Sequence, residues 1–102
     1  TYLGPKPYGP GFELPRGEHL EDWLSDQAAD FIHQNRTKPF FLNYWAFSVH
    51  SPYVAKPELI AKYEKKAASL PKNAVHRNPL YAAMVHSLDD AVGKLLNAID
   101  EA

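Results

Sequence analysis

The chain has 102 residues, 45% of them hydrophobic, and a formal net charge of −1 at pH 7. This composition argues against disorder, and the 11 Lys and Arg residues are too scattered to form a nucleic-acid-binding stripe. The absence of cysteine excludes disulfides and thiolate sites from this chain. No apolar run approaches the roughly 18 residues that a membrane-spanning helix needs. Because Thr1 rather than Met comes first, we expect an internal piece or a processed product.

Residues 1–19 contain many glycines and prolines, which interrupt helices and central strands. We therefore expect a surface loop pinned by aromatic side chains, with the rim of a substrate pocket as the alternative. Residues 22–35 follow, and their apolar side chains recur at helical spacing. We predict a helix there, with Asp22 as the N-cap and Asn35 as a left-handed terminator.

Residues 39–47 are apolar on both faces of a predicted strand. One face would carry Phe41, Trp45 and Phe47, and the other Phe40, Leu42, Tyr44 and Ala46. A strand that is apolar on both faces is typical of the centre of an α/β sheet, with helices above and below. The sequence thus predicts one central strand at about 39–47.

Two further helices are predicted, at about 57–67 and 79–101. Pro57 and Pro79 suit the first helical position, and Asn78 suits the N-cap of the last helix. We predict an Asp90–Lys94 pair on the outside of that helix. Its expected inner stripe comprises Tyr81, Met84, Val85, Leu88, Val92, Leu95, Leu96 and Ile99.

A single central strand cannot pair its own backbone groups, and each buried unpaired group costs about 1–3 kcal/mol. We therefore expect residues 20–102 to be an internal segment of a larger α/β enzyme. The alternative is that two copies pair through residues 39–47.

His50 is the best candidate for a catalytic residue, because ligands gather at the carboxyl ends of strands in such sheets. Imidazole can also donate to an anion or move a proton near neutral pH. An ordinary capping histidine in a loop is the alternative. His86 and Asp90 are four residues apart on a helix, which we interpret as a solvated pair rather than a metal site. Asp89 is expected to be a buried structural carboxylate.

Three segments together resemble sulfatases of the arylsulfatase type, over about residues 20–101. The longest is residues 38–52, KPFFLNYWAFSVHSP, which is followed by Pro57-Glu58 and Tyr63. The other two are residues 81–96, YAAMVHSLDDAVGKLL, and residues 26–32, DQAADFI. Their order along the chain is the order in the family.

The resemblance implies an alkaline-phosphatase-like three-layer α/β fold and hydrolysis of sulfate esters of a small molecule or glycan. It also implies a formylglycine nucleophile and a calcium ion, both supplied by other parts of the parent enzyme, so this segment would be inactive alone. Of the family's catalytic set only His50 maps onto this chain, as a substrate-contacting residue, and Lys56 is a weaker substrate-binding candidate. The family suggests a periplasmic, secreted or lysosomal protein.

Two alternatives remain open at this stage. One keeps the fold but changes the reaction to hydrolysis of phosphoryl or phosphonate esters. The other is a non-catalytic module that oligomerises through residues 39–47, in which His50 is an ordinary capping residue.

Overall fold

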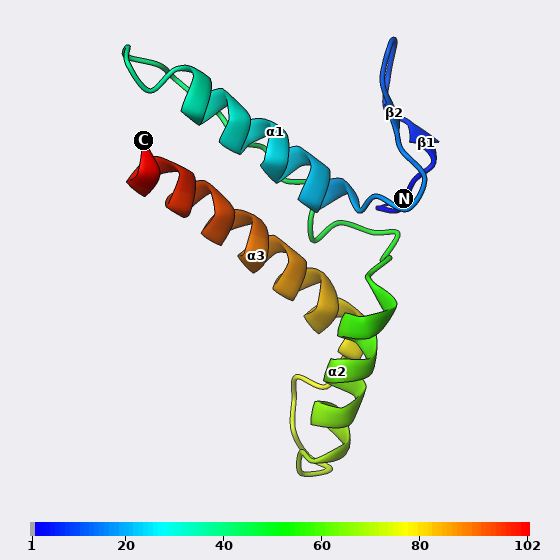
Figure 1. Cartoon of the computed structure of the whole chain (residues 1–102). Coiled ribbons are helices and arrows are strands. Elements are labelled where there is room, and N and C mark those ends of the chain that lie inside the picture. The colour runs from blue at the N-terminus through cyan, green and yellow to red at the C-terminus, as the bar shows by residue number, and fades with distance from the viewer. Residues whose placement is uncertain (1) are drawn as a thin grey trace.

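The computed structural model describes residues 2–102, which form three helices and one small sheet (Figure 1). None of the helices in this part of the chain is long and apolar enough to span a bilayer. The elements in chain order are β1 (Lys6–Pro7), β2 (Glu13–Leu14), α1 (Leu20–Gln34), α2 (Pro57–Ala68) and α3 (Pro79–Glu101).

The Gly/Pro-rich segment is a loop, as predicted, but it contains a short hairpin. β1 and β2 pair antiparallel, with Lys6 opposite Leu14. Gly9 and Gly11 have φ angles of 101° and 78°, which only glycine adopts without strain, and they make the reversal between the two strands. The loop then returns to α1, where an isolated bridge joins Leu3 to His19.

The ends of α1 differ from the prediction. The helix begins at Leu20, and its N-cap is His19 rather than Asp22, because the His19 Nδ1 accepts from the backbone N–H of Glu21. Asn35 does end the helix, but with φ −109° rather than in the left-handed region. Its side-chain amide donates at 2.7 Å to the carbonyl of Phe31, which also accepts from the Asn35 backbone N–H at 3.1 Å.

The starts of α2 and α3 confirm the sequence signals. Both helices have proline in the first turn, where a missing N–H does no harm. Asn78 is the N-cap of α3, and its side-chain oxygen accepts from the backbone N–H of Tyr81 at 3.1 Å.

α1 and α3 lie side by side and run in the same direction, as Figure 1 shows. The Lys94 ammonium contacts the Asp26 carboxylate at 2.5 Å, and the His33 ring lies 3.7 Å from Glu101 near the far ends of both helices. The predicted pair of Lys94 with Asp90 is therefore wrong. Lys94 reaches across to α1 instead of along its own helix.

The predicted inner stripe of α3 is also mostly wrong. Of that stripe only Met84 is fully buried, whereas Leu96 is 57% exposed. Small side chains allow neighbouring helices to approach closely, and apart from Met84 they occupy the buried positions of α3. These positions are Ala83, Met84, Ser87, Ala91 and Ala98. Most of the larger apolar side chains form a second face of α3, on which Val85, Val92, Leu96 and Ile99 are 44–57% exposed.

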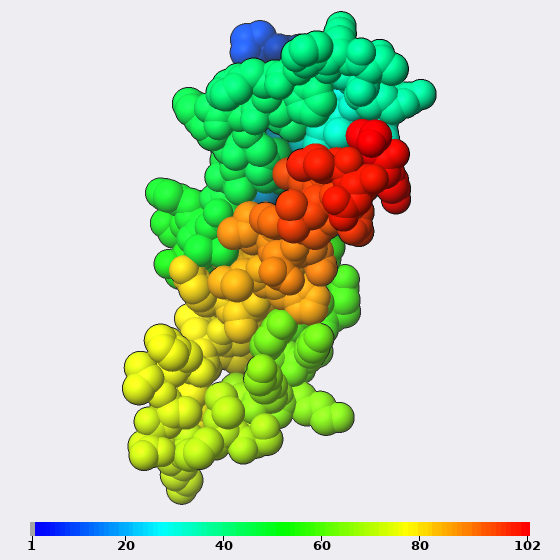
Figure 2. Space-filling model, turned by 90° about the vertical axis from the view of Figure 1, so that its left-hand side faces the viewer, coloured from blue at the N-terminus to red at the C-terminus, as the bar shows by residue number. Residues whose placement is uncertain are grey.

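Residues 39–47 do not form the predicted strand. They contain no turn or bend, but no backbone hydrogen bond joins residues 39–46 to another part of the described chain. The alternation of faces is nevertheless present, since Leu42, Tyr44 and Ala46 are half-buried and Phe41 is 86% exposed. Figure 2 shows the teal-to-green segment that follows α1 lying on the outside of the molecule. A ladder is absent here because residues 2–102 contain no partner strand for this segment.

The chain is more open than a self-contained domain. Its radius of gyration is 16.0 Å, against about 13 Å for a compact domain of 100 residues. Its accessible surface is 7049 Å², against about 5,800 Å² for a globular protein of this mass. The main core is correspondingly small and lies where the hairpin loop, the start of α1 and the start of α3 meet; it comprises Tyr2, Leu14, Leu20, Ala55, Ala83 and Met84.

Candidate active site

His50 follows a turn at the carboxyl end of the 39–47 segment. The backbone N–H of His50 donates to the carbonyl of Phe47 at 3.2 Å, which closes the turn. The ring is exposed, and its Nδ1 lies 2.6 Å from the carbonyl oxygen of Ser51. Because a carbonyl oxygen can only accept, Nδ1 carries a hydrogen and Nε2 is the nitrogen left for a ligand.

The hydroxyl of Tyr2 forms hydrogen bonds with the backbone of this turn. It lies 2.8 Å from the carbonyl oxygens of both Phe47 and His50, which share its single hydrogen, and it accepts from the His50 N–H at 2.9 Å. Tyr2 is itself held to α1, since its carbonyl accepts from the backbone N–H of Leu20 at 2.7 Å. Burial raises the pKa of the Tyr2 phenol, so the hydroxyl keeps its proton at neutral pH.

A buried carboxylate holds the same turn from α1. Glu21 is fully buried, and its Oε1 accepts from the backbone N–H of Ser48 at 2.6 Å. The other carboxylate oxygen accepts from the Tyr44 hydroxyl at 3.3 Å. Burial, together with the negative charge of Glu21, raises the pKa of the Tyr44 phenol. Both oxygens of the carboxylate therefore anchor the segment that leads to His50.

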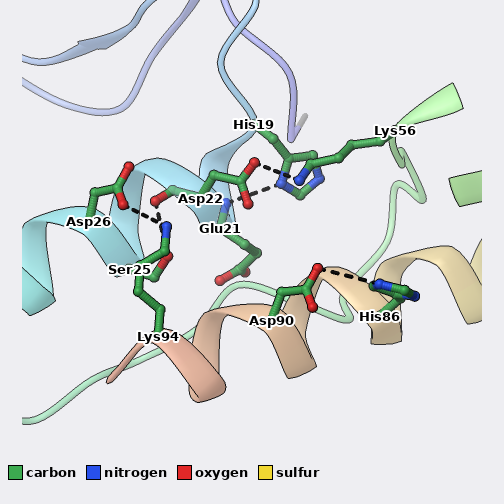
Figure 3. Close-up of polar contacts among 9 residues, drawn as sticks. All are labelled: His19, Glu21, Asp22, Ser25, Asp26, Lys56, His86, Asp90 and Lys94. Atoms are coloured by element: carbon green, nitrogen blue, oxygen red, sulfur yellow. Dashed lines mark hydrogen bonds and ion pairs between the residues drawn. The ribbon is translucent and has the colours of Figure 1, made fainter. Parts of the chain in front are cut away.

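His19 joins these two anchors. Its ring stacks on Tyr2 with centroids 5.9 Å apart, and its Nδ1 caps α1 at Glu21 (Figure 3). Only 3% of His19 is exposed. Burial lowers the pKa of the ring, which favours the neutral form. The Nε2 atom has no hydrogen-bond partner among residues 2–102.

Lys56, the weaker substrate-binding candidate, is already paired. Its ammonium lies 2.6 Å from a carboxylate oxygen of Asp22, and Figure 3 shows the side chain extending from the start of α2 to α1. The pair is only partly exposed, so Lys56 fastens the loop after His50 to the first turn of α1.

The histidine on α3 forms a local polar pair, as the sequence indicated. The His86 Nε2 lies 3.4 Å from Asp90, and Nδ1 lies 2.8 Å from the hydroxyl of Tyr63 on α2. Asp89, expected to be buried, is exposed. Across the described residues, no group of three or more His, Asp and Glu side chains could hold a metal ion.

Sequence reasoning selected His50 as a candidate but missed the residues that hold its turn. Tyr2 and Glu21 contact the turn from 45 or more and 27 residues away along the chain. Neither residue has a local motif: Tyr2 stands in a glycine- and proline-rich loop, and Glu21 reads as an ordinary acidic residue near a helix start. Only the folded chain shows that they meet.

Comparisons with known proteins agree with this architecture. The family model described as Sulfatase matches residues 2–102, so the chain belongs to the sulfatase family. A protein of Formosa agariphila named "Sulfatase" is 36% identical over 87 residues, which is 82% of this chain and 15% of that protein. The chain therefore spans about a seventh of the length of that relative.

Solved structures give the same result. The crystal structure of Ps i-CgsB covers 90% of this chain with a TM-score of 0.67 at 30% sequence identity. The same protein in complex with k-i-k-neocarrahexaose gives a TM-score of 0.66 at 31% identity. In each case the match covers 19% of that chain. The α/β class and the section of an alkaline-phosphatase-like fold are thus confirmed.

The calcium ion and formylglycine that the family resemblance implies do not fit the residues present here. The described residues bring together no set of metal-ligating side chains, and the chain contains no cysteine. We therefore derive no step of the reaction through either group.

Proposed function

We propose that this chain works as a section of a longer sulfatase, here called the complete enzyme, and that His50 contacts the sulfate ester in it. The observation that supports this role is the turn that ends at His50. Buried groups hold the backbone of the turn on one side, while the imidazole is exposed on the other. The open, unpaired 39–46 segment supports the view that the 102 residues alone are inactive.

The geometry of the ring suggests what His50 contributes. Hydrolysis of a sulfate monoester separates sulfur from the bridging oxygen, on which negative charge develops as the alcohol or phenol leaves. In the protonated ring, Nδ1–H points at the Ser51 carbonyl and Nε2–H is free to donate to that bridging oxygen. After proton transfer the ring is neutral, with its remaining hydrogen on Nδ1, and the leaving group departs as the neutral alcohol.

The substrate class that we propose is a sulfated glycan. The support is the solved neighbour in complex with k-i-k-neocarrahexaose, a carrageenan oligosaccharide. Within this chain Lys56 is the candidate for contacting an anionic sugar, and it would have to exchange its ion pair with Asp22 for that contact.

The test is His50→Ala in the complete enzyme, with release of sulfate from phenyl sulfate and from neocarrahexaose as the readouts. We expect kcat/KM to fall by about 10²-fold or more, which corresponds to roughly 3 kcal/mol of lost transition-state stabilisation. His76→Ala is the matched control, since His76 is exposed in the loop between α2 and α3. Near-unchanged turnover by His50→Ala would remove the site assignment. A complete enzyme that hydrolyses phenyl phosphate but neither sulfate ester would contradict the proposed reaction.

A further inference from the structure

We propose that Tyr2 and Glu21 are positioning residues for His50, which they hold through the backbone of its turn. This inference rests on the proposed function, because it assigns the two residues a part in the same reaction. Neither is expected to touch substrate: Tyr2 is 4% exposed and Glu21 is fully buried.

The hydroxyl of Tyr2 holds the turn at both of its ends. It contacts the carbonyl of Phe47 and both the N–H and the carbonyl of His50, so one side chain bonds to both ends of the turn. The backbone of His50 sets the origin of its side chain, and a displacement of about 1 Å at a reacting group can cost 10²-fold in rate. Removing the hydroxyl releases the peptide groups on either side of the imidazole.

The carboxylate of Glu21 accepts a hydrogen bond from the middle of the turn, at the Ser48 N–H. A hydrogen bond from a backbone N–H to a carboxylate is about twice as strong as one between neutral groups. The 2.6 Å distance is at the short end of the range for such bonds. Glu21 on α1 and Tyr2 in the N-terminal loop thus form hydrogen bonds to adjacent parts of the turn.

The segment that precedes the turn does not hold it in place. The backbone of residues 39–46 makes no hydrogen bond within the described chain, so it cannot fix the turn from the N-terminal side. Tyr44 adds a side-chain contact there, but again to Glu21. Within residues 2–102, the hydrogen bonds that join the turn itself to the hairpin loop and α1 come from Tyr2 and Glu21, while the Lys56–Asp22 pair fastens the loop that follows.

The experiment is Tyr2→Phe in the complete enzyme, with two aryl sulfates that differ in their leaving group. Phenol leaves poorly and needs a proton, whereas 4-nitrophenolate leaves without one. We expect kcat for phenyl sulfate to fall about tenfold, which is within the value of one or two hydrogen bonds, and kcat for 4-nitrophenyl sulfate to fall less than about threefold. KM should change less than about twofold for either substrate.

This readout separates positioning from loss of folded protein. A purely structural defect reduces the amount of active enzyme and lowers kcat for both substrates by the same factor, and that outcome would overturn the proposal. Tyr81→Phe is the matched control: it deletes a tyrosine hydroxyl on α3, and it should change neither rate. In a His50→Ala background, Tyr2→Phe should have no further effect on kcat, because the group that it positions is gone.

Glu21 provides a second and independent variant. Glu21→Gln keeps an amide oxygen for the Ser48 N–H, so we expect it to retain most of the phenyl sulfate activity that Glu21→Ala loses. Failure of the two proposals can be told apart. If His50→Ala leaves both rates unchanged, the proposed function fails and this inference with it. If His50→Ala impairs phenyl sulfate hydrolysis while Tyr2→Phe and Glu21→Ala do not, only the positioning role is wrong.

Discussion

Two adjacent regions of this chain, the turn at residues 47–50 and the segment at residues 39–46, are held in opposite ways. The turn receives hydrogen bonds from the hairpin loop and from α1, through Tyr2 and Glu21. The segment before it has the side-chain alternation of a strand but no backbone hydrogen bond to another part of the described chain.

The contrast shows which interactions are local to this section of a sulfatase and which depend on the rest. A turn that is to present a histidine in a fixed direction needs a fixed backbone, and buried polar groups within the same section supply it. A central strand needs neighbours on both edges, and those can come from distant parts of a sheet. The turn before the candidate residue His50 is therefore fixed by contacts within this section, whereas the sheet is not.

The largest expected effect concerns the 102 residues expressed alone. Because the 39–46 segment and the second face of α3 are uncovered, we expect no cooperative melt and self-association through residues 39–47. Sedimentation and circular dichroism measure both properties. Trp45→Lys and Phe41→Lys should reduce the association, and Val75→Lys, at an equally exposed site in a loop, should not. A monomer with a sharp melt would show that the 39–46 segment does not depend on other parts of the complete enzyme.

Trp45 can be used to test, in the complete enzyme, whether other parts of the protein cover this segment. It is 78% exposed in this section, and exposed positions usually tolerate substitution within about 0.5 kcal/mol. If a partner layer covers it, Trp45→Ala will instead lower the free energy of unfolding by about 3–5 kcal/mol. Urea denaturation of the complete enzyme measures this, with Val75→Ala as the exposed control. A change below about 1 kcal/mol would mean that this face meets solvent.

The helices could be predicted from sequence because their signals are local. Pro57, Asn78 and Pro79 mark the starts of α2 and α3 through capping rules that operate within one turn. The buried stripe of α3 could not be predicted, because hydrophobicity marks every apolar face alike. Which face packs on α1 depends on the size of the side chains there, and Ala91 and Ala98 are too small to stand out in a periodicity.

The candidate site also has a part that sequence could indicate and a part that it could not. The place of His50 after a turn was predictable because an apolar segment, a turn signal and the histidine follow one another along the chain. The anchors were not, because a hydrogen bond between Glu21 and Ser48 leaves no trace in the neighbouring residues. The burial of His19 was not predictable for a related reason: it depends on Tyr2 stacking over it from the start of the loop.

His19 should make the anchored region sensitive to acid. Its pKa is lowered by burial, so the unfolded chain binds the proton first. This part of the stability is complete above the ordinary pKa of 6.5 and is lost as the pH falls below it. Asp22 opposes the shift and Lys56 reinforces it, but burial is the larger cause.

The measurement is the urea midpoint of the complete enzyme at about pH 7.5 and about pH 5.5, on either side of the ordinary histidine pKa. His19→Asn retains a side-chain oxygen for the N-cap and cannot titrate, so its midpoint should fall less than that of the unmodified protein. Equal losses in both proteins would assign the acid sensitivity to other groups.

The smallest effect is expected at the Lys94–Asp26 pair between α3 and α1. Both side chains are substantially exposed, at 38% and 58%, and such pairs contribute about 0.2–1 kcal/mol. A double-mutant cycle with Lys94→Met and Asp26→Asn should therefore give a coupling below about 1 kcal/mol, reduced further in about 1 M salt. A coupling of about 3 kcal/mol that resists salt would mean that the complete enzyme buries the pair. A weak coupling would mean that the packing of small buried side chains, and not this ion pair, holds α1 against α3. An ion pair this exposed contributes too little to fix two helices whose surfaces are not complementary.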